Sequence, residues 1–130
     1  MFKNKLIILG IGFLLVITSG CYKVATLVIE DNQEITTPVS LANDLQPIFD
    51  KSCTSSGCHN TGGKVPNLSR DKSYTSLVDG GYVNVDVPKS SELYLWLTGV
   101  KTPSMPIGVN NPSNINNLVL AWIKQGAKNN

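Results

Sequence analysis

The chain has 130 residues, of which 42% are apolar and 15% charged, and its formal net charge is +2. That length allows one domain with a modest core. Three Cys cannot supply the four thiolates of a tetra-Cys iron–sulfur cluster, and a single His, His59, excludes a Cys2His2 zinc finger. A Ser-His-Asp triad would likewise depend on His59 alone.

The N-terminus has the pattern of a secretion signal. A short positive region precedes an apolar run at residues 6–17, which is short for a membrane-spanning helix but typical of a signal-peptide core. The small residues before Cys21 resemble the lipobox of bacterial lipoproteins, in which the signal is cleaved before a Cys that carries the lipid. Thr18 stands where that family prefers Leu. We expect residues 1–20 to be a lipoprotein signal peptide and Cys21 to be lipidated; an uncleaved anchor, or ordinary cleavage that leaves a spare thiol, is the alternative.

Cleavage would change the charge of the protein. It would remove Lys3 and Lys5 and no acidic residue, so the formal charge of the mature chain would be zero. Nucleic-acid binding needs concentrated positive charge and has no support in such a chain. Export would also place Cys53 and Cys58 where disulfides can form.

A polar segment without helical periodicity separates Cys21 from the rest of the chain. We expect residues 21–39 to be the lipidated Cys and a tether, with a short strand at 25–29, and residues 40–130 to be one domain. The tether could span up to roughly 60 Å when extended. The lipid would hold the domain to a membrane of the bacterial cell envelope, on the periplasmic side or the cell surface. Tyr22 after the lipidated Cys slightly favours the outer membrane.

The helical pattern begins at residue 40. Apolar residues recur at helical spacing from Leu41 to Phe49. Pro47 is tolerated only in the first turn of a helix, which favours Asp44 over Ser40 as the N-cap.

Three further helices are expected at residues 71–78, 92–97 and 115–123. The last has the clearest apolar face, with Ser113 as its cap and Gly126 as its stop. Long irregular loops are expected at 59–70 and 99–114. The sequence therefore predicts a small all-α domain of about four short helices with long loops.

Two thiols followed at once by an imidazole lie at the end of the first expected helix. They are Cys53, Cys58 and His59, with four residues between the two Cys. Covalent haem attachment requires this set, because the thiols add across the two vinyl groups and the adjacent imidazole becomes the proximal iron ligand. The usual spacing is two residues, so the four here are expected to bulge outward, which suits Gly57 and its serine neighbours.

An electron-transfer haem needs a second axial ligand, and the Met thioether is a common one. Met105 is the only Met after the initiator, and it stands between Pro103 and Pro106, which stiffen its loop. We therefore expect His59 and Met105 to bind the iron of one covalently bound haem c. Met105 as a core filler is the alternative. The walls of the haem crevice are expected to include four aromatic residues, Tyr74, Tyr94, Trp96 and Trp122.

Further matching segments accompany these motifs, at residues 45–49, 65–68, 91–94, 105–106 and 121–127. With them the chain from 40 to 127 resembles the class I monohaem cytochromes c, of the lipoprotein type with a Cys-x4-Cys-His motif. The resemblance implies a small cytochrome c fold in which the first and last helices cross, with four side chains at their contact, Leu45, Phe49, Leu118 and Trp122. It also implies that the backbone carbonyl of Pro66 orients the ring of His59.

The function implied is electron transfer rather than enzymatic turnover. The haem would exchange electrons with a donor and an acceptor protein, while the lipid at Cys21 holds the domain to the membrane. Two other functions remain open: a haem-based sensor or ligand binder in which the Met105 bond is weak or absent, and a non-haem structural lipoprotein with a Cys53–Cys58 disulfide. A zinc site of Cys53, Cys58, His59 and a carboxylate is a third possibility for the same residues.

Overall fold

The computed structural model describes residues 34–108 and 111–130. All regular elements in this part are helical, and it contains no strand, as the sequence predicts. They are the π-helical turn η1 (Leu41–Leu45), α2 (Gln46–Ser52), α3 (Ser73–Val78), the 3-10 turn η2 (Pro88–Ser90), α4 (Glu92–Leu97) and α5 (Ser113–Lys124). No helix among the described residues has the length and apolar content needed to cross a bilayer. The expected signal peptide, Cys21 and the strand at 25–29 lie outside the described residues.

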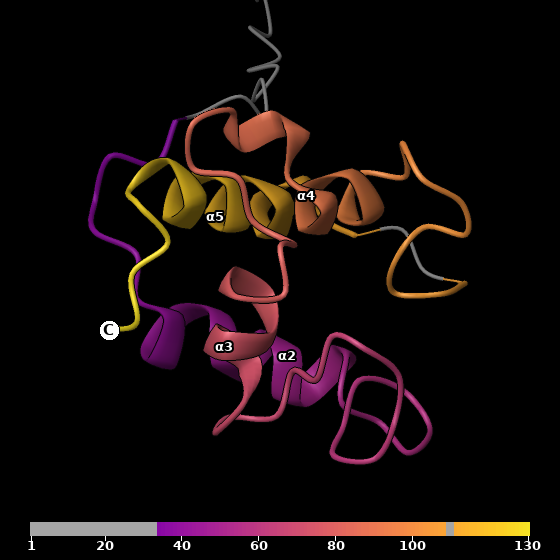
Figure 1. Cartoon of the computed structure of the whole chain (residues 1–130). Helices are drawn as coiled ribbons and strands as arrows, with labels where there is room; N and C mark the ends of the chain where they lie inside the picture. Colours follow the sequence, from indigo (N-terminus) through magenta and orange to yellow (C-terminus); the bar gives the residue numbers. More distant parts are fainter. Residues whose placement is uncertain (1–33, 109–110) are drawn as a thin grey trace, which may run out of the picture.

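The elements form two layers (Figure 1). α4, α5 and η2 make one layer, and α2 and α3 make the other. α5 packs against α4, η2 and η1, so the last helix contacts the start of the first helical segment. Long irregular segments leave both layers on the same side, after α2 and after α4.

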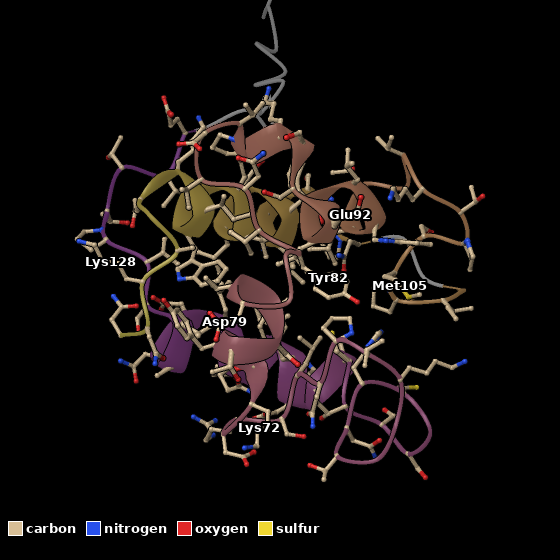
Figure 2. The ribbon with its side chains drawn as sticks, viewed as in Figure 1. Lys72, Asp79, Tyr82, Glu92, Met105 and Lys128 are labelled. Atoms are coloured by element: carbon tan, nitrogen blue, oxygen red, sulfur yellow. The ribbon has the colours of Figure 1, made fainter. Side chains whose placement is uncertain are left out.

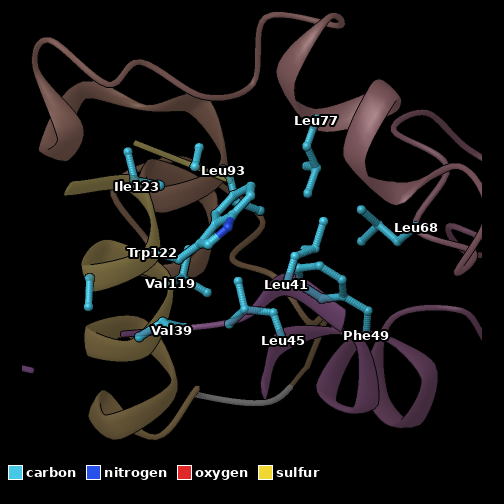
Figure 3. Close-up of a cluster of buried hydrophobic side chains, with 12 residues drawn as sticks. Val39, Leu41, Leu45, Phe49, Leu68, Leu77, Leu93, Val119, Trp122 and Ile123 are labelled. Carbon is cyan, nitrogen blue, oxygen red and sulfur yellow. The ribbon is translucent and has the colours of Figure 1, made fainter. Parts of the chain in front are cut away.

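The apolar core lies between the layers (Figure 3). Leu45 and Trp122 are completely buried and Phe49 nearly so, and all three belong to one cluster, with Leu118 half-buried against it. Trp122 also donates its indole N–H to the carbonyl of Lys128 at 2.9 Å, so its polar group is satisfied inside the fold. These are the four side chains that the resemblance places between the first and last helices, although the contact of α5 is with η1.

The start of the first helix differs from the prediction. Ser40, not Asp44, is the N-cap: its hydroxyl accepts the N–H of Asn43 at 3.1 Å. The Asp44 carboxylate instead accepts the N–H of Ser40 at 2.7 Å, which makes a reciprocal pair of the capping-box kind. A π-helical turn follows Ser40, and α2 begins only after it. Pro47 therefore still falls in a first turn, where its missing N–H costs no helical hydrogen bond.

The other helices match their predicted positions closely. α4 occupies the expected residues, and α3 begins two residues later than expected. Ser113 is the first residue of α5 rather than its cap, because Pro112 holds the cap position. Pro112 has no N–H to lose there, and its fixed φ suits the entry to a helix.

Residues 34–39, the described end of the expected tether, are bound along α5. The Gln125 amide accepts the N–H of Val39 at 2.8 Å and donates to the carbonyl of Thr37 at 2.9 Å. Lys124 forms an ion pair with Glu34 at 2.7 Å, and its hydrogen bond and charge lower the pKa of that carboxyl. Val39 is buried. This segment is therefore part of the folded unit.

Candidate functional site

A cavity of about 200 Å³ brings most of the expected site residues together. Cys53, His59, Pro66 and Met105 all contribute to its wall, and the rest of the lining consists of aliphatic and aromatic side chains from α2, α4 and the loops beside them. The chain segments that carry His59 and Met105 are far apart in the sequence and follow different layers of the fold. The cavity is therefore made by tertiary structure and not by the Cys-His motif alone.

The loop that carries the two Cys is closed by backbone hydrogen bonds. The N–H of His59 donates to the carbonyl of Cys53 at 3.0 Å, and the N–H of Lys64 donates to the carbonyl of Cys58 at 2.7 Å. Gly57 has a φ of +77°, a conformation that favours glycine at the tip of this loop, which is exposed. Gly63 is required for a different reason: a Cβ there would lie 2.1 Å from the Cys58 carbonyl oxygen.

The ring of His59 has a defined orientation and tautomer. Its Nδ1 lies 2.9 Å from the carbonyl oxygen of Pro66. A carbonyl can only accept, so Nδ1 carries the hydrogen, and in the neutral ring Nε2 is left as the nitrogen with a free lone pair. This is the hydrogen-bond arrangement that orients metal-binding His side chains. The contact between Pro66 and His59 is the one implied by the resemblance.

Met105 reaches the same cavity from the loop after α4 (Figure 2). Its side chain is half-buried, and its N–H donates to the carbonyl of Trp96 at 3.0 Å. Figure 2 shows Met105 and Tyr82 at the level between the two layers, and both line the cavity. His59 and Met105 therefore line the same apolar space.

The two Cys differ in their surroundings. Cys53 is half-buried in the cavity wall, whereas Cys58 is exposed and does not line the cavity; both are free thiols. Burial raises the pKa of the Cys53 thiol to about 11, with a smaller contribution from the neighbouring Cys58. Within the described ranges, no three His, Cys, Asp or Glu side chains lie close enough to hold a metal ion, so the ligand set of the zinc interpretation is not assembled there.

The aromatic walls were predicted only in part. Of the four expected residues, Trp96 lines the cavity, whereas Trp122 lies in the core and Tyr74 packs against it. Tyr82 lines the cavity and was not predicted. It comes from an irregular segment, and its carbonyl accepts the N–H of Leu93 at 3.0 Å, so its position depends on α4.

A second hollow of about 350 Å³ lies between residues 34–35, η2, α4 and α5. Its lining includes Tyr94, Lys89 and Lys124 but no imidazole, thiol or thioether. Tyr94 therefore belongs to this polar groove and not to the wall of the candidate site.

The donor set around the smaller cavity suits haem. His59 offers a nitrogen with a free lone pair, Met105 offers a thioether, and the Cys53–Cys58 loop offers two thiols beside an apolar wall. The volume of about 200 Å³ is below that of most closed ligand pockets, so part of a macrocycle would extend past the cavity towards exposed residues such as Val65.

No protein-family model, curated protein or solved structure matches this chain.

Proposed function

We propose that the chain is a membrane-tethered electron-transfer protein with the small cytochrome c fold and one haem c. The observation that carries the proposal is the hydrogen bond from His59 to Pro66, which leaves Nε2 of the ring free in an apolar cavity that Met105 also lines. An oriented imidazole and a thioether on the wall of one apolar space are the pair of groups that His/Met ligation of haem iron uses.

Cys53 and Cys58 attach the haem. Each thiol would add its sulfur to one carbon of a vinyl double bond and its hydrogen to the other, so that two thioethers would form with no oxidant or reductant consumed. The two thiols differ in position: Cys53 lies in the cavity wall, and Cys58 lies at the exposed loop.

His59 and Met105 are the axial ligands. When bound, the haem supplies one-electron chemistry through the ferrous and ferric states of its iron. The protein keeps both ligands in place and surrounds the site with apolar side chains such as Phe49, Leu68 and Trp96. An apolar surrounding disfavours the more highly charged ferric site and raises the reduction potential. No substrate is turned over, and the lipid at Cys21 keeps the domain near its redox partner proteins.

The direct test is a reduced-minus-oxidised visible spectrum of the purified full chain, with haem staining on a denaturing gel and an intact mass. The proposal requires haem that stays on the polypeptide after denaturation. A mass lower by two hydrogens and no haem would instead identify the structural lipoprotein with a Cys53–Cys58 disulfide.

Carbon monoxide binding to the reduced protein tests the second ligand. Met105→Ala opens the sixth position, so the variant should bind carbon monoxide rapidly while the parent protein binds it slowly. Rapid binding by the parent protein would favour the ligand-binding function over electron transfer, because it means that the Met105 bond is weak or absent.

A further inference from the structure

The loop that carries Met105 is held to α4 by few contacts. α4 ends at Leu97, and the chain leaves the helix at Gly99, whose φ of +75° favours glycine. Two backbone hydrogen bonds bring it back: the N–H of Lys101 donates to the carbonyl of Leu95 at 3.2 Å, and the N–H of Met105 donates to that of Trp96 at 3.0 Å. These carbonyls lie in the last turn of α4, and each also accepts a longer hydrogen bond of 3.4 Å, Trp96 from the N–H of Gly99 and Leu95 from the hydroxyl of Thr98.

The side chain of Lys101 adds a third attachment. Its Nζ lies 2.6 Å from Oε1 of Glu92 and also contacts Oε2. Glu92 is the first residue of α4, so the ion pair joins the loop to the helix about one turn before the carbonyls that bind the loop backbone. Figure 2 shows Glu92 on α4 and Met105 on the loop that follows it. Lys101 and Glu92 form the one ion pair of residues 98–108 within the described part of the chain.

Trp96 connects this attachment to the cavity. The Lys101 ammonium lies 5.7 Å from the centre of its ring, within the range of a cation–π contact. The carbonyl of Trp96 accepts the N–H of Met105, and its side chain lines the cavity beside the thioether. Lys101 thus contacts the residue that holds the backbone of Met105.

We propose that Lys101 is a positioning residue for Met105. Its ion pair with Glu92 and its contact with the Trp96 ring hold the loop against α4, so that the thioether stays at the cavity. This inference depends on the proposed function, in which Met105 is an iron ligand. Without the ion pair, the loop opens more often, and the sixth position of the iron becomes accessible to external ligands.

The test compares Lys101→Met with Lys72→Met. The substitution keeps the apolar stem of the side chain and removes the charge. Lys72 is exposed, forms no ion pair within the described residues and lies in the other layer, away from Met105 in Figure 2. In reduced haem-loaded protein, Lys101→Met should raise the rate of carbon monoxide binding about five- to tenfold, as expected for the loss of one partly exposed ion pair and one cation–π contact. Lys72→Met should leave the rate unchanged.

Two measurements separate positioning from a general loss of stability. Hydrogen exchange of the Met105 N–H should accelerate in Lys101→Met by a similar factor, and Lys101→Arg should restore slow exchange. Added salt should raise the carbon monoxide rate of the parent protein and leave that of Lys101→Met unchanged, because screening acts on the ion pair.

Equal Met105 exchange in the Lys101 and Lys72 variants would overturn the inference. If the chain carries no haem, the visible spectrum refutes the proposed function. The exchange rate of the Met105 N–H then still decides whether Lys101 holds the loop.

Discussion

Gln46 is a buried polar side chain that joins three segments of the fold. It belongs to α2 and is 1% exposed. Its amide nitrogen donates to the carbonyl of Leu68 at 2.9 Å and to the Asp50 carboxylate at 2.8 Å, and its amide oxygen accepts the hydroxyl of Ser73 at 2.7 Å. The N–H of Leu68 in turn donates to the carbonyl of His59 at 2.7 Å. Gln46 therefore supports the segment that lies directly against the candidate ligand.

The cost of removing this amide follows from the groups that it leaves without partners. Gln46→Met keeps the length and the apolar packing of the side chain. It leaves the Leu68 carbonyl and the Ser73 hydroxyl unsatisfied in the interior, at about 1–3 kcal/mol for each group. Asp50 stays exposed and paired with Arg70, so it adds little. We expect the free energy of unfolding to fall by about 2–4 kcal/mol, which lowers the Tm of a domain of this size by about 10–20 °C.

The measurement is urea unfolding of the haem-loaded chain, followed by circular dichroism. Ser73→Ala is the matched variant, because it removes the partner that Gln46→Met leaves unpaired. The double variant should therefore lose about 1 kcal/mol less than the sum of the two single losses. A loss below about 0.5 kcal/mol in Gln46→Met, or strict additivity in the double variant, would refute the reasoning. Either result would mean that the Leu68 carbonyl and the Ser73 hydroxyl do not depend on Gln46 for their hydrogen bonds.

Two other predictions concern the candidate site. Gly63→Ala places a Cβ against the Cys58 carbonyl and should reduce the haem content per polypeptide several-fold. Gly80→Ala, which follows α3 and would place a Cβ equally close to the Ser76 carbonyl, should lower stability but leave the haem content of the folded protein unchanged. Equal haem content in the Gly63 variant and the parent protein would contradict this. A haem-free chain, made by replacing Cys53 and Cys58 with Ser, should lose most of its helical circular dichroism, because the side chains around an empty cavity lack packing partners. Cooperative unfolding of that chain would contradict the prediction.

The regular elements were predictable because their signals are local. α4 and α5 each have a continuous run of apolar residues at helical spacing, ended by a glycine. The π-helical turn at η1 was not predictable, because apolar residues four positions apart fit a π-helical turn as well as an α-helical one. There the geometry depends on the pairing of Ser40 with Asp44, and either of those residues could have been the cap.

The site residues also divide into those with a local sequence signal and those without one. Cys53, Cys58 and His59 are neighbours in the sequence, so their spacing was enough to select them. Met105 could be selected only because it is the one Met after the initiator, and what brings it to the cavity is the tertiary contact with Trp96. No feature of the sequence indicated that Tyr82 would line the cavity.

Aromatic residues show why the walls of the cavity could not be assigned from the pattern alone. Trp96 and Trp122 both lie in apolar helices, and from the sequence either could have faced the cavity. The difference arises from the layers: α4 lies beside the cavity, so Trp96 contributes to its wall, whereas α5 faces η1 and the centre of the core, so Trp122 is buried there. Sequence periodicity identifies the buried face of a helix but not what that face is buried against.

The binding of residues 34–39 along α5 changes the expected reach of the lipid tether. Val39 and Gln125 attach this segment to the helix, and Asn130 accepts the N–H of Ala42 at 2.8 Å, which fastens the start of η1 to the C-terminus. The segment that could act as a tether then ends before Glu34. The thirteen residues from Cys21 to the residue before it can span at most about 45 Å, compared with roughly 60 Å for a tether that extended to residue 39. A lipid at Cys21 would therefore hold the domain closer to the bilayer than the sequence suggested, and a redox partner of this protein would have to present its own site within that shorter distance.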